Sequence, residues 1–460
     1  MATYQYDIAI IGAGPGGYVA AIAAAKEGKT VCIIERAAFG GVCLNEGCIP
    51  TKTLIKTANL FQEMKQAASF GIEGVDPAGL SVSMTRLQER RKRVISRLAG
   101  GVKSLLKSNK VTILEGEASF VDKHTLKVGN TRVTAENIII ATGSVPFMPP
   151  FIPLQGKTCV ITSKEALELA ELPASMAIIG GGVIGIEFAY LLHTLGCKIT
   201  VLELMDRILP MVDAEISAMV QQRLQKAGIT FHLGAKVKAV RDNAVLFEAG
   251  GVESSATADI VLMAVGRLPD IKGLNLEAAG VACEKGAVIT DEYMRTNVPG
   301  IYAIGDVNAR MMLAHTASHE GMVAVKHICG KQAAMQYNAI PSCIYLEPEV
   351  AAIGLTEEQA KAQCASVKIG KFPMAANGKS LVEGDTAGMI KVIADGDTGE
   401  ILGAHLFCKH ATDMIAEIAL AMTLEATVDD IMETIHPHPT VSESVPEAFM
   451  AAFGKAIHTM

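Results

Sequence analysis

The chain has 460 residues, of which half are apolar and 19% are charged, so it is long enough to form about three domains with sizeable cores. Its net charge of −7 argues against a nucleic-acid-binding surface, and we expect its longest basic run, Arg90–Arg93, to face solvent on a polar helix. The ten cysteines are scattered and follow no signal peptide, a pattern typical of a reducing, cytoplasmic compartment.

The first apolar segment, residues 8–25, is interpreted as a strand, a tight turn and a helix rather than as a membrane anchor. It has no basic flank, and Gly14–Gly17 interrupts its middle. The pattern is that of a dinucleotide-binding unit, in which one glycine allows the turn, the next lets a pyrophosphate approach and the third lets the helix pack. In chain order the unit consists of strand Ile8–Ile11, Gly12, Gly14, Gly17, a helix, strand Val31–Ile34 and Glu35, an acceptor for ribose hydroxyls.

Two cysteines, Cys43 and Cys48, follow this unit and are separated by four residues, and Lys52 lies one helical turn after the second. Residues i and i+5 of a regular helix are too far apart to bridge comfortably. A disulfide here therefore needs a distorted start to the helix and would be reducible. The alternatives are two unrelated thiols or half of a zinc site, but the other eight cysteines offer no second Cys/His pair. We interpret the segment as a redox-active pair.

The dinucleotide pattern occurs a second time. It consists of strand Met176–Ile179, Gly180, Gly182, Gly185, a helix, strand Ile199–Leu202 and Glu203. In both copies the acidic residue lies 18 positions after the third glycine (35 − 17 and 203 − 185). One such loop is a weak signal and could be an ordinary turn, but two in the same context predict two bound dinucleotides. Glu203 would repel a 2′-phosphate and no arginine pair follows it, so we expect NAD rather than NADP.

Three further strands end in small or acidic residues. Two of them close the nucleotide units and run into Ala141-Thr142-Gly143 and into Ala264-Val265-Gly266. The prolines between Pro146 and Pro153 are interpreted as a linker. The third strand leads into Asp306, which we expect either to cap a helix or to accept a sugar-like hydroxyl.

These motifs resemble those of the pyridine nucleotide–disulfide oxidoreductases over essentially the whole chain. The resemblance rests on both glycine fingerprints, Cys43–Cys48, Ala141-Thr142-Gly143, Glu187, Gly266-Arg267, Ile304-Gly305-Asp306 and His436-Pro437-His438-Pro439-Thr440-x-Ser442-Glu443. It implies an α/β fold with two Rossmann-like FAD/NAD-binding domains and a C-terminal α+β dimerisation domain. The implied divisions are 1–145 (first part of the FAD domain), 146–270 (NAD domain), 271–340 (central domain completing the FAD site) and 341–460 (interface domain).

The resemblance also implies two sets of cofactor-binding residues. The FAD set is Gly12, Gly14, Gly17, Glu35, Gly41, Lys52, Gly116, Thr142, Gly143, Asp306 and Ala314. The NAD set is Gly180, Gly182, Gly185, Glu203, Val237, Gly266 and Arg267.

Within the family, the resemblance is to members that oxidise protein-bound dihydrolipoyl groups with NAD. It implies that Cys43 exchanges with the dithiol, that Cys48 faces the flavin and that Lys52 pairs with Glu187. His438 would be the base, oriented by Glu443. In similar enzymes the base comes from the second subunit of a homodimer.

His436 is expected to be structural. The implied partners are lipoyl domains of a 2-oxo acid dehydrogenase, acetoin or glycine-cleavage complex, with no nucleic acid and no membrane insertion. Glutathione- and mercuric-reductase-like activities are alternatives. The first needs basic residues for substrate carboxylates, and the second a C-terminal cysteine pair, which the segment 453–460 lacks. A non-catalytic flavoprotein subunit is disfavoured because all six predicted catalytic residues are present.

Overall fold

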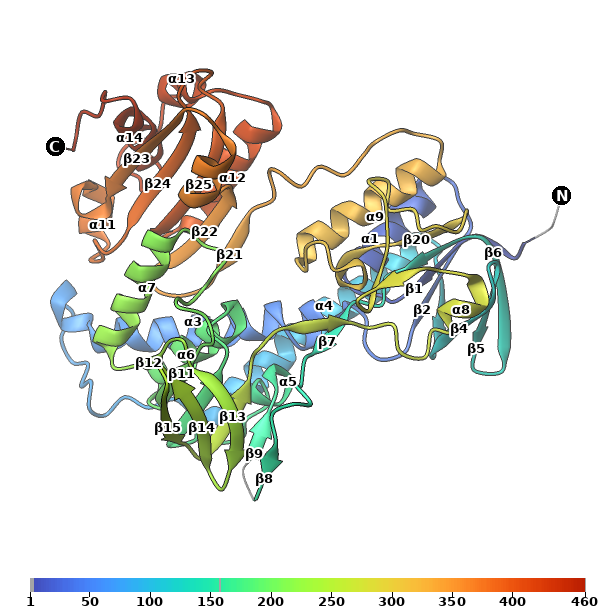
Figure 1. Ribbon diagram of the computed structural model, residues 1–460, viewed down its shortest axis with the longest axis horizontal. Coiled ribbons are helices and arrows are strands. Elements are labelled where there is room, and N and C mark those ends of the chain that lie inside the picture. Colours follow the sequence, from blue (N-terminus) through green and yellow to red (C-terminus); the bar gives the residue numbers. More distant parts are fainter. Residues whose placement is uncertain (1–3, 157–158, 460) are drawn as a thin grey trace.

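The computed structural model describes residues 4–156 and 159–459, and it has the α/β architecture expected from the sequence (Figure 1). Two units built on parallel sheets and one C-terminal unit built on an antiparallel sheet follow one another along the chain. The C-terminal unit lies at one end of the molecule and the N-terminal strands lie at the other (Figure 1). Among the described residues, no helix is both long and apolar enough to cross a bilayer.

The first sheet is built around β1 (Tyr6–Ile11), whose Ile8–Ile11 end is fully apolar and buried. Strand β1 pairs in parallel with β2 (Val31–Glu35) and β6 (Thr131–Ile140), as expected for a strand that is buried on both faces. The sheet is completed by β3 (Thr112–Glu115), β4 (Ala118–Asp122), β5 (Thr125–Val128) and β20 (Ile301–Ala303). Helix α1 (Pro15–Lys26) packs along α9 (Ala314–Ile328), so residues from the 271–340 segment return to the first unit.

The second unit repeats this arrangement. Its central strand β10 (Ser175–Ile179) pairs in parallel with β11 (Lys198–Leu202) and β16 (Ile260–Met263). The unit further contains β9 (Cys159–Ile161), β12 (Thr230–His232), α5 (Ser163–Ala166), α6 (Val183–Leu195), α7 (Ala214–Ala227) and a second sheet of β8 (Leu154–Gln155), β13 (Lys236–Arg241), β14 (Ala244–Ala249) and β15 (Val252–Thr257).

A two-stranded ribbon joins the first two units. The chain leaves the first unit through β7 (Ser144–Pro146) and returns through β17 (Arg267–Pro269), which pairs with β7 in antiparallel fashion. The predicted proline linker is therefore partly strand, because β7 ends at Pro146 and β8 begins at Leu154. The divisions at residues 145 and 270 fall at this ribbon, and they stay a prediction.

The C-terminal unit contains β21 (Ser342–Ile344), β22 (Glu349–Gly354), β23 (Val367–Pro373), β24 (Met389–Asp395), β25 (Ile401–Cys408), α12 (Ala411–Thr423), α13 (Val428–Glu433) and α14 (Ser444–Ala452). It docks on the second unit through a shared apolar core that includes Met389 and Phe407. Beside this core the buried ammonium of Lys391 lies 2.8 Å from the buried carboxylate of Asp213. Lys391 also lies 2.6 Å from Glu357 of its own unit, so this buried cluster of charges connects the two units and would be broken by separating them.

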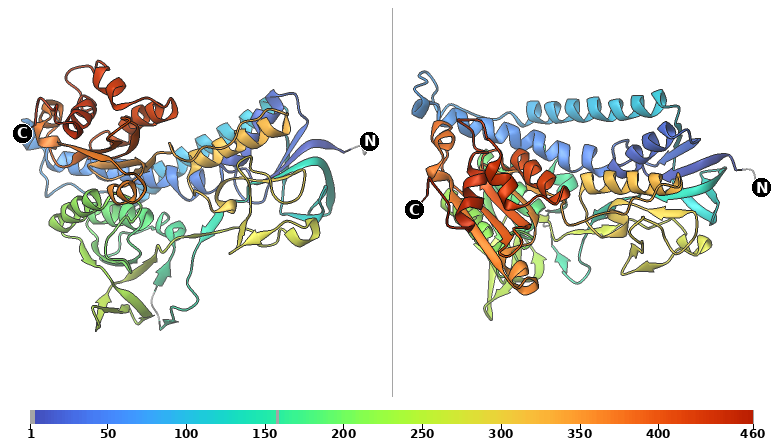
Figure 2. Two further views of the ribbon diagram at one scale, coloured as in Figure 1. Left: turned by 45° about the horizontal axis from the view of Figure 1, so that its top comes forward. Right: turned by 90° about the horizontal axis from the view of Figure 1, so that it is seen from above.

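Two long helices run along the molecule and lie side by side in the view from above (Figure 2). They are α3 (Cys48–Lys65) and α4 (Met84–Ser108). The expectation that Arg90–Arg93 faces solvent is wrong for Arg91, whose side chain is buried and lies 3.5 Å from Glu168 of the second unit. Arg90 is half-buried and donates a hydrogen bond to Thr53 O of α3 at 3.0 Å, whereas Lys92 and Arg93 are exposed.

Candidate active site

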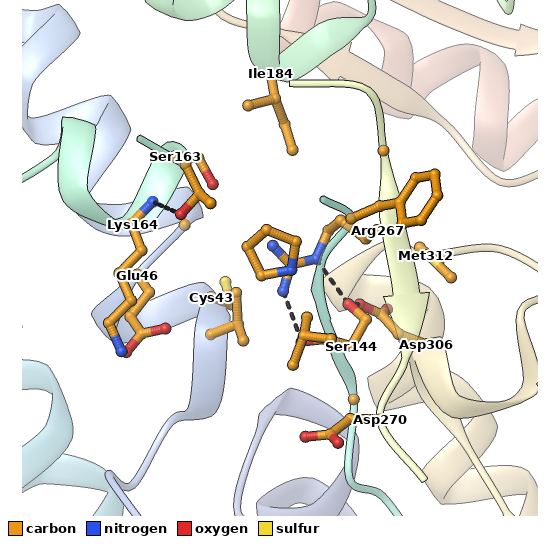
Figure 3. A pocket seen from close by; sticks show the side chains of 18 of the residues that line it. Cys43, Glu46, Ser144, Ser163, Lys164, Ile184, Arg267, Asp270, Asp306 and Met312 are labelled. Atoms are coloured by element: carbon orange, nitrogen blue, oxygen red, sulfur yellow. Dashed lines mark hydrogen bonds and ion pairs between the residues drawn. The ribbon is translucent and has the colours of Figure 1, made fainter. Parts of the chain in front are cut away.

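A cavity of about 1980 Å³ lies between the first two units and is lined by both glycine loops and by both cysteines of the predicted redox pair. Ligand pockets usually measure roughly 300–1,000 Å³, so this cavity has room for more than one large ligand. Figure 3 shows Cys43 inside it, with Glu46 and Lys164 on one side and Arg267, Ser144 and Asp306 on the other.

The two glycine loops have the same geometry, and their glycines have two kinds of role. A Cβ atom added at the first glycine would lie 2.3 Å from Ala141 O at Gly12 and 2.4 Å from Ala264 O at Gly180. At the second glycine the cavity side is open, since a Cβ at Gly182 would meet no protein atom within 4 Å. The first glycine is thus required by the protein itself, whereas the second leaves space that a ligand can use.

The third glycines, Gly17 and Gly185, do not line the cavity, and their place in the cofactor-binding sets stays a prediction. A Cβ atom there would lie 1.9 Å from Gly12 O and 2.0 Å from Gly180 O. Their role is to let the helix pack against the first glycine of its own loop.

The two acidic residues that end the second strands are also equivalent. The carboxylate of Glu35 accepts hydrogen bonds from Ala13 N at 2.7 Å and from Ala37 N at 2.8 Å. The buried carboxylate of Glu203 accepts them from Gly181 N and, at 2.7 Å, from Met205 N. Each carboxylate is therefore fixed against the cavity wall, with lone pairs left for a ligand.

The cysteines come together because the helix between them is interrupted. Helix α2 (Gly41–Asn45) contains Cys43, and α3 begins at Cys48 after Glu46 and Gly47 leave the helical conformation. This confirms the expected distortion at the helix start. The two thiols form a hydrogen bond with each other, and their disulfide stays a prediction.

The two thiols differ in acidity. The pKa of Cys48 is lowered to about 7, chiefly because Cys43 donates a hydrogen bond to its sulfur, and secondly because the ammonium of Lys52 lies nearby. The pKa of Cys43 is raised, since its proton is held by Cys48 and its surroundings are buried. Cys48 also lies at the N-terminus of α3, where the helix dipole favours an anion. Of the two thiols, Cys48 is therefore the more acidic.

Lys52 and Glu187 form the expected ion pair, with 2.8 Å between Nζ and Oε2. The side chain of Glu187 is almost fully buried in α6, and its Oε1 also accepts a hydrogen bond from Tyr345 N at 3.0 Å. The ammonium lies 4.6 Å from the centre of the Tyr345 ring. The first, second and C-terminal units therefore meet at this pair.

Asp306 does not cap a helix, which corrects one of the two expectations for it. It lies inside a short 3-10 helix (Gly305–Asn308) that begins after Ile304, and its carboxylate accepts a hydrogen bond from the Ser144 hydroxyl. Arg267 donates to the same hydroxyl and to Ser144 O, both at 2.7 Å. Arg267, expected in the NAD set, is thus connected to a residue of the FAD set.

Most of the predicted site residues meet in the cavity. They are Gly12, Gly14, Glu35, Gly41, Cys43, Cys48, Lys52, Gly116, Thr142, Gly143, Gly180, Gly182, Glu187, Glu203, Val237, Gly266, Arg267, Asp306 and Ala314. Ser144, Tyr345 and the ion pair between Glu46 and Lys164 (2.6 Å) also belong to it. No local sequence pattern indicates these residues, because each is placed by a contact between distant segments.

The predicted base and its partner lie elsewhere. His438 and Glu443 face each other, with 3.0 Å between Nδ1 and Oε2, but neither lines the cavity of the same chain. The His438 side chain is 79% exposed. One chain alone therefore does not bring this histidine to the cysteines.

Comparison with known proteins agrees with this geometry. The model of the pyridine nucleotide-disulphide oxidoreductase family matches residues 6–321, and that of its dimerisation domain matches residues 340–449. A dihydrolipoyl dehydrogenase of Bacillus subtilis is 44% identical to this chain, with 100% of both proteins covered. A mitochondrial dihydrolipoyl dehydrogenase of Pisum sativum is 39% identical, with 99% of this chain and 93% of that protein covered.

Two solved structures are also similar over nearly the whole chain. The Cu(II) complex of the HOCl-induced flavoprotein disulfide reductase RclA from Escherichia coli has a TM-score of 0.86 at 30% identity, covering 98% of this chain and 99% of that chain. LpdA from Mycobacterium tuberculosis has a TM-score of 0.87 at 25% identity, covering 96% and 98%.

The hydrogen bond between the thiols predicts how the reduced pair titrates. In a pH titration of ultraviolet thiolate absorbance, with Cys48→Ser as background, the reduced protein should form one thiolate with a midpoint near 7. Cys43→Ala should raise this midpoint, because Cys48 loses its donor but stays buried. Cys43→Ser retains a donating hydroxyl and is the matched control, with a smaller rise. An unchanged midpoint in Cys43→Ala would show that the hydrogen bond does not set the acidity of Cys48.

Proposed function

Because the chain belongs to the pyridine nucleotide–disulphide oxidoreductase family, we propose that it oxidises dihydrolipoyl groups carried by partner proteins and passes the electrons to NAD. The observation that carries this proposal is the position of the Cys43–Cys48 dithiol between two dinucleotide-binding loops in one cavity. The dihydrolipoyl dehydrogenases that match the chain over their full length support the choice of substrate.

The residues around the first loop fit FAD. Gly14 borders the cavity, and a Cβ atom there would approach no protein atom closer than 3.9 Å. Thr142 Oγ1 is buried in the same wall without a hydrogen-bond partner, as expected of a group that awaits a ligand. Glu35, Asp306 and Lys52 would hold the ribose, the sugar-like chain and the flavin end. When bound, FAD would supply the two-electron transfer that connects the dithiol to NAD.

The residues around the second loop fit NAD. Gly182 leaves open space beside the N-terminus of α6, where the helix dipole and free amides favour a pyrophosphate. Glu203 would accept both ribose hydroxyls and would repel a 2′-phosphate.

The chain's own residues carry out the thiol chemistry. With Cys43 and Cys48 joined as a disulfide, a thiolate of the dihydrolipoyl group attacks Cys43 Sγ, forms a mixed disulfide and releases Cys48 as the thiolate. The second lipoyl thiolate then attacks the lipoyl sulfur of this bond, closes the lipoyl disulfide and releases Cys43. Two protons leave the substrate, and we assign His438 to accept them in turn. Lys52 stabilises the Cys48 thiolate.

We further propose that His438 acts on the cysteines of a second copy of the chain in a homodimer. The match to a dimerisation domain supports the homodimer. In the same unit the apolar side chains of Leu420, Leu424 and Ile435 are 60%, 70% and 96% exposed, as expected of residues that a second copy would cover. In a two-fold dimer each cavity would then receive one histidine from the partner.

The lipoyl groups would be supplied by lipoyl domains of a 2-oxo acid dehydrogenase, acetoin or glycine-cleavage complex. A cytoplasmic location is also part of the proposal, supported by the nine free cysteines among the described side chains.

The direct test is NADH formation from dihydrolipoamide and NAD. We expect the FAD-loaded protein to catalyse this reaction, and Cys43→Ser and Cys48→Ser to abolish it while retaining NADH oxidation by ferricyanide, which needs no thiol exchange. Faster reduction of glutathione disulfide by NADPH would instead identify the protein as a glutathione-type reductase.

The nucleotide preference depends on Glu203. Glu203→Ala should lower kcat/KM for NAD, because the ribose hydroxyls lose their acceptor, and should raise it for NADP, because Lys236 and Lys238 line the cavity nearby. The NAD/NADP ratio should fall by roughly tenfold or more. Glu203→Gln retains a carbonyl for Met205 N or Gly181 N and controls for disruption of the loop. An unchanged ratio in both variants, or a wild-type preference for NADP, would contradict the assignment.

A further inference from the structure

His438 lies in the loop between α13 and α14, and its position is set by the backbone of that loop. Its ring is 79% exposed and is held by Glu443. Glu443 belongs to the same loop, so this contact does not connect His438 to the rest of the protein. The contacts between this loop and the rest of the C-terminal unit therefore determine the position of His438.

One anchor lies two residues before His438. The side chain of His436 is 7% exposed, and its Nε2 lies 2.6 Å from Glu417 Oε1 on α12. Its Nδ1 lies 2.9 Å from Thr434 O. Both partners are acceptors. A neutral imidazole has one donor and one acceptor, so only a ring with a proton on both nitrogens donates to both partners.

A second anchor lies two residues after His438. The buried side chain of Asn377 donates from Nδ2 to Thr440 O at 3.0 Å. The Thr440 hydroxyl donates back to Pro437 O at 2.7 Å. His438 thus lies between two anchored residues. His436 is held by an ion pair, and Thr440 is held by neutral hydrogen bonds.

We propose that His436 is a positioning residue for His438: as an imidazolium bound to Glu417, it ties the loop to α12 and sets where the base meets the thiols. This inference rests on the proposed role of His438. It goes beyond a structural role for His436 in two ways. The His436 ring carries a positive charge, and its contact with Glu417 affects the oxidation of thiols but not the oxidation of NADH.

The chemistry of the pair offers a conservative variant. Glu417→Ala leaves the buried Nε2 without a partner and releases the loop. In Glu417→Gln a neutral His436 can still donate from Nδ1 to Thr434 O and accept a hydrogen bond at Nε2 from the amide, so the anchor persists without the ion pair. A control variant is Glu383→Ala, since Glu383 lies 3.1 Å from His410 in the same unit; the side chain of His410 is 53% exposed, so this contact is not a buried anchor.

The test compares two activities of the FAD-loaded enzyme. Glu417→Ala should lower kcat/KM for dihydrolipoamide by roughly tenfold or more, the scale of a displaced catalytic group, without changing NADH oxidation by ferricyanide. Glu417→Gln and Glu383→Ala should retain both activities. The reference variant His438→Gln should lower the first activity by about 10²-fold or more. If His438→Gln has no effect, the proposed base is wrong. If His438→Gln is impaired and Glu417→Ala is not, or if Glu417→Gln is impaired as strongly as Glu417→Ala, the positioning role is wrong.

A spectroscopic measurement tests the charge in the unaltered protein. In ¹⁵N spectra of protein labelled at histidine, the His436 signals, identified by their loss in His436→Gln, should show a proton on both ring nitrogens at the pH of the assay. A single protonated nitrogen would overturn the proposal whether or not the variants fold.

Discussion

The interruption between α2 and α3 is the constraint on which the rest of the site depends. If the helix continued through Glu46 and Gly47, Cys43 and Cys48 would point in different directions and could not share a proton. The break brings the sulfurs into contact and places Cys48 at a new helix N-terminus. The same helix then carries Lys52 one turn further, to Glu187 of the second unit. One local distortion thus fixes the redox pair, the charge that stabilises its thiolate and a link between the first two units.

The duplicated nucleotide unit gives the cavity two equivalent walls. In both copies the first glycine lets the loop lie close to the backbone that follows the closing strand, and the second glycine leaves space for a ligand. The β7–β17 ribbon holds the two copies together, and the contact of Arg267 with Ser144 and Asp306 crosses this ribbon. The C-terminal unit is fixed to the second unit by the buried Lys391–Asp213 pair and reaches the cavity through Tyr345. Contacts between all three units therefore hold the walls of the site in place around the dithiol, which is its reactive group.

The sequence predicted those features that depend on local pattern. Strands β1 and β10, the open space at Gly182 and the helix distortion at Cys48 follow from residue spacing and backbone sterics, and the structure contains them. The pairing of Lys52 with Glu187 followed from the family resemblance. What could not be predicted depends on tertiary packing. Arg267 and Ser144 meet although they are 123 positions apart, and Arg91 is buried because α4 packs against two other segments. No local pattern distinguishes such residues from their neighbours at the surface.

The central claim is that the thiols of one chain work with the histidine of another. It is tested most directly by mixing two inactive proteins, Cys43→Ser and His438→Gln, after reversible dissociation. Random reassembly makes about half of the dimers mixed. Each mixed dimer has one site in which both residues are wild type and one site in which neither is. Roughly a quarter of the wild-type dihydrolipoamide activity should therefore return. If the histidine acts within its own chain, every site contains one of the two substitutions and no activity returns. No recovery of activity, with mixed dimers demonstrated by mass spectrometry, would contradict the account.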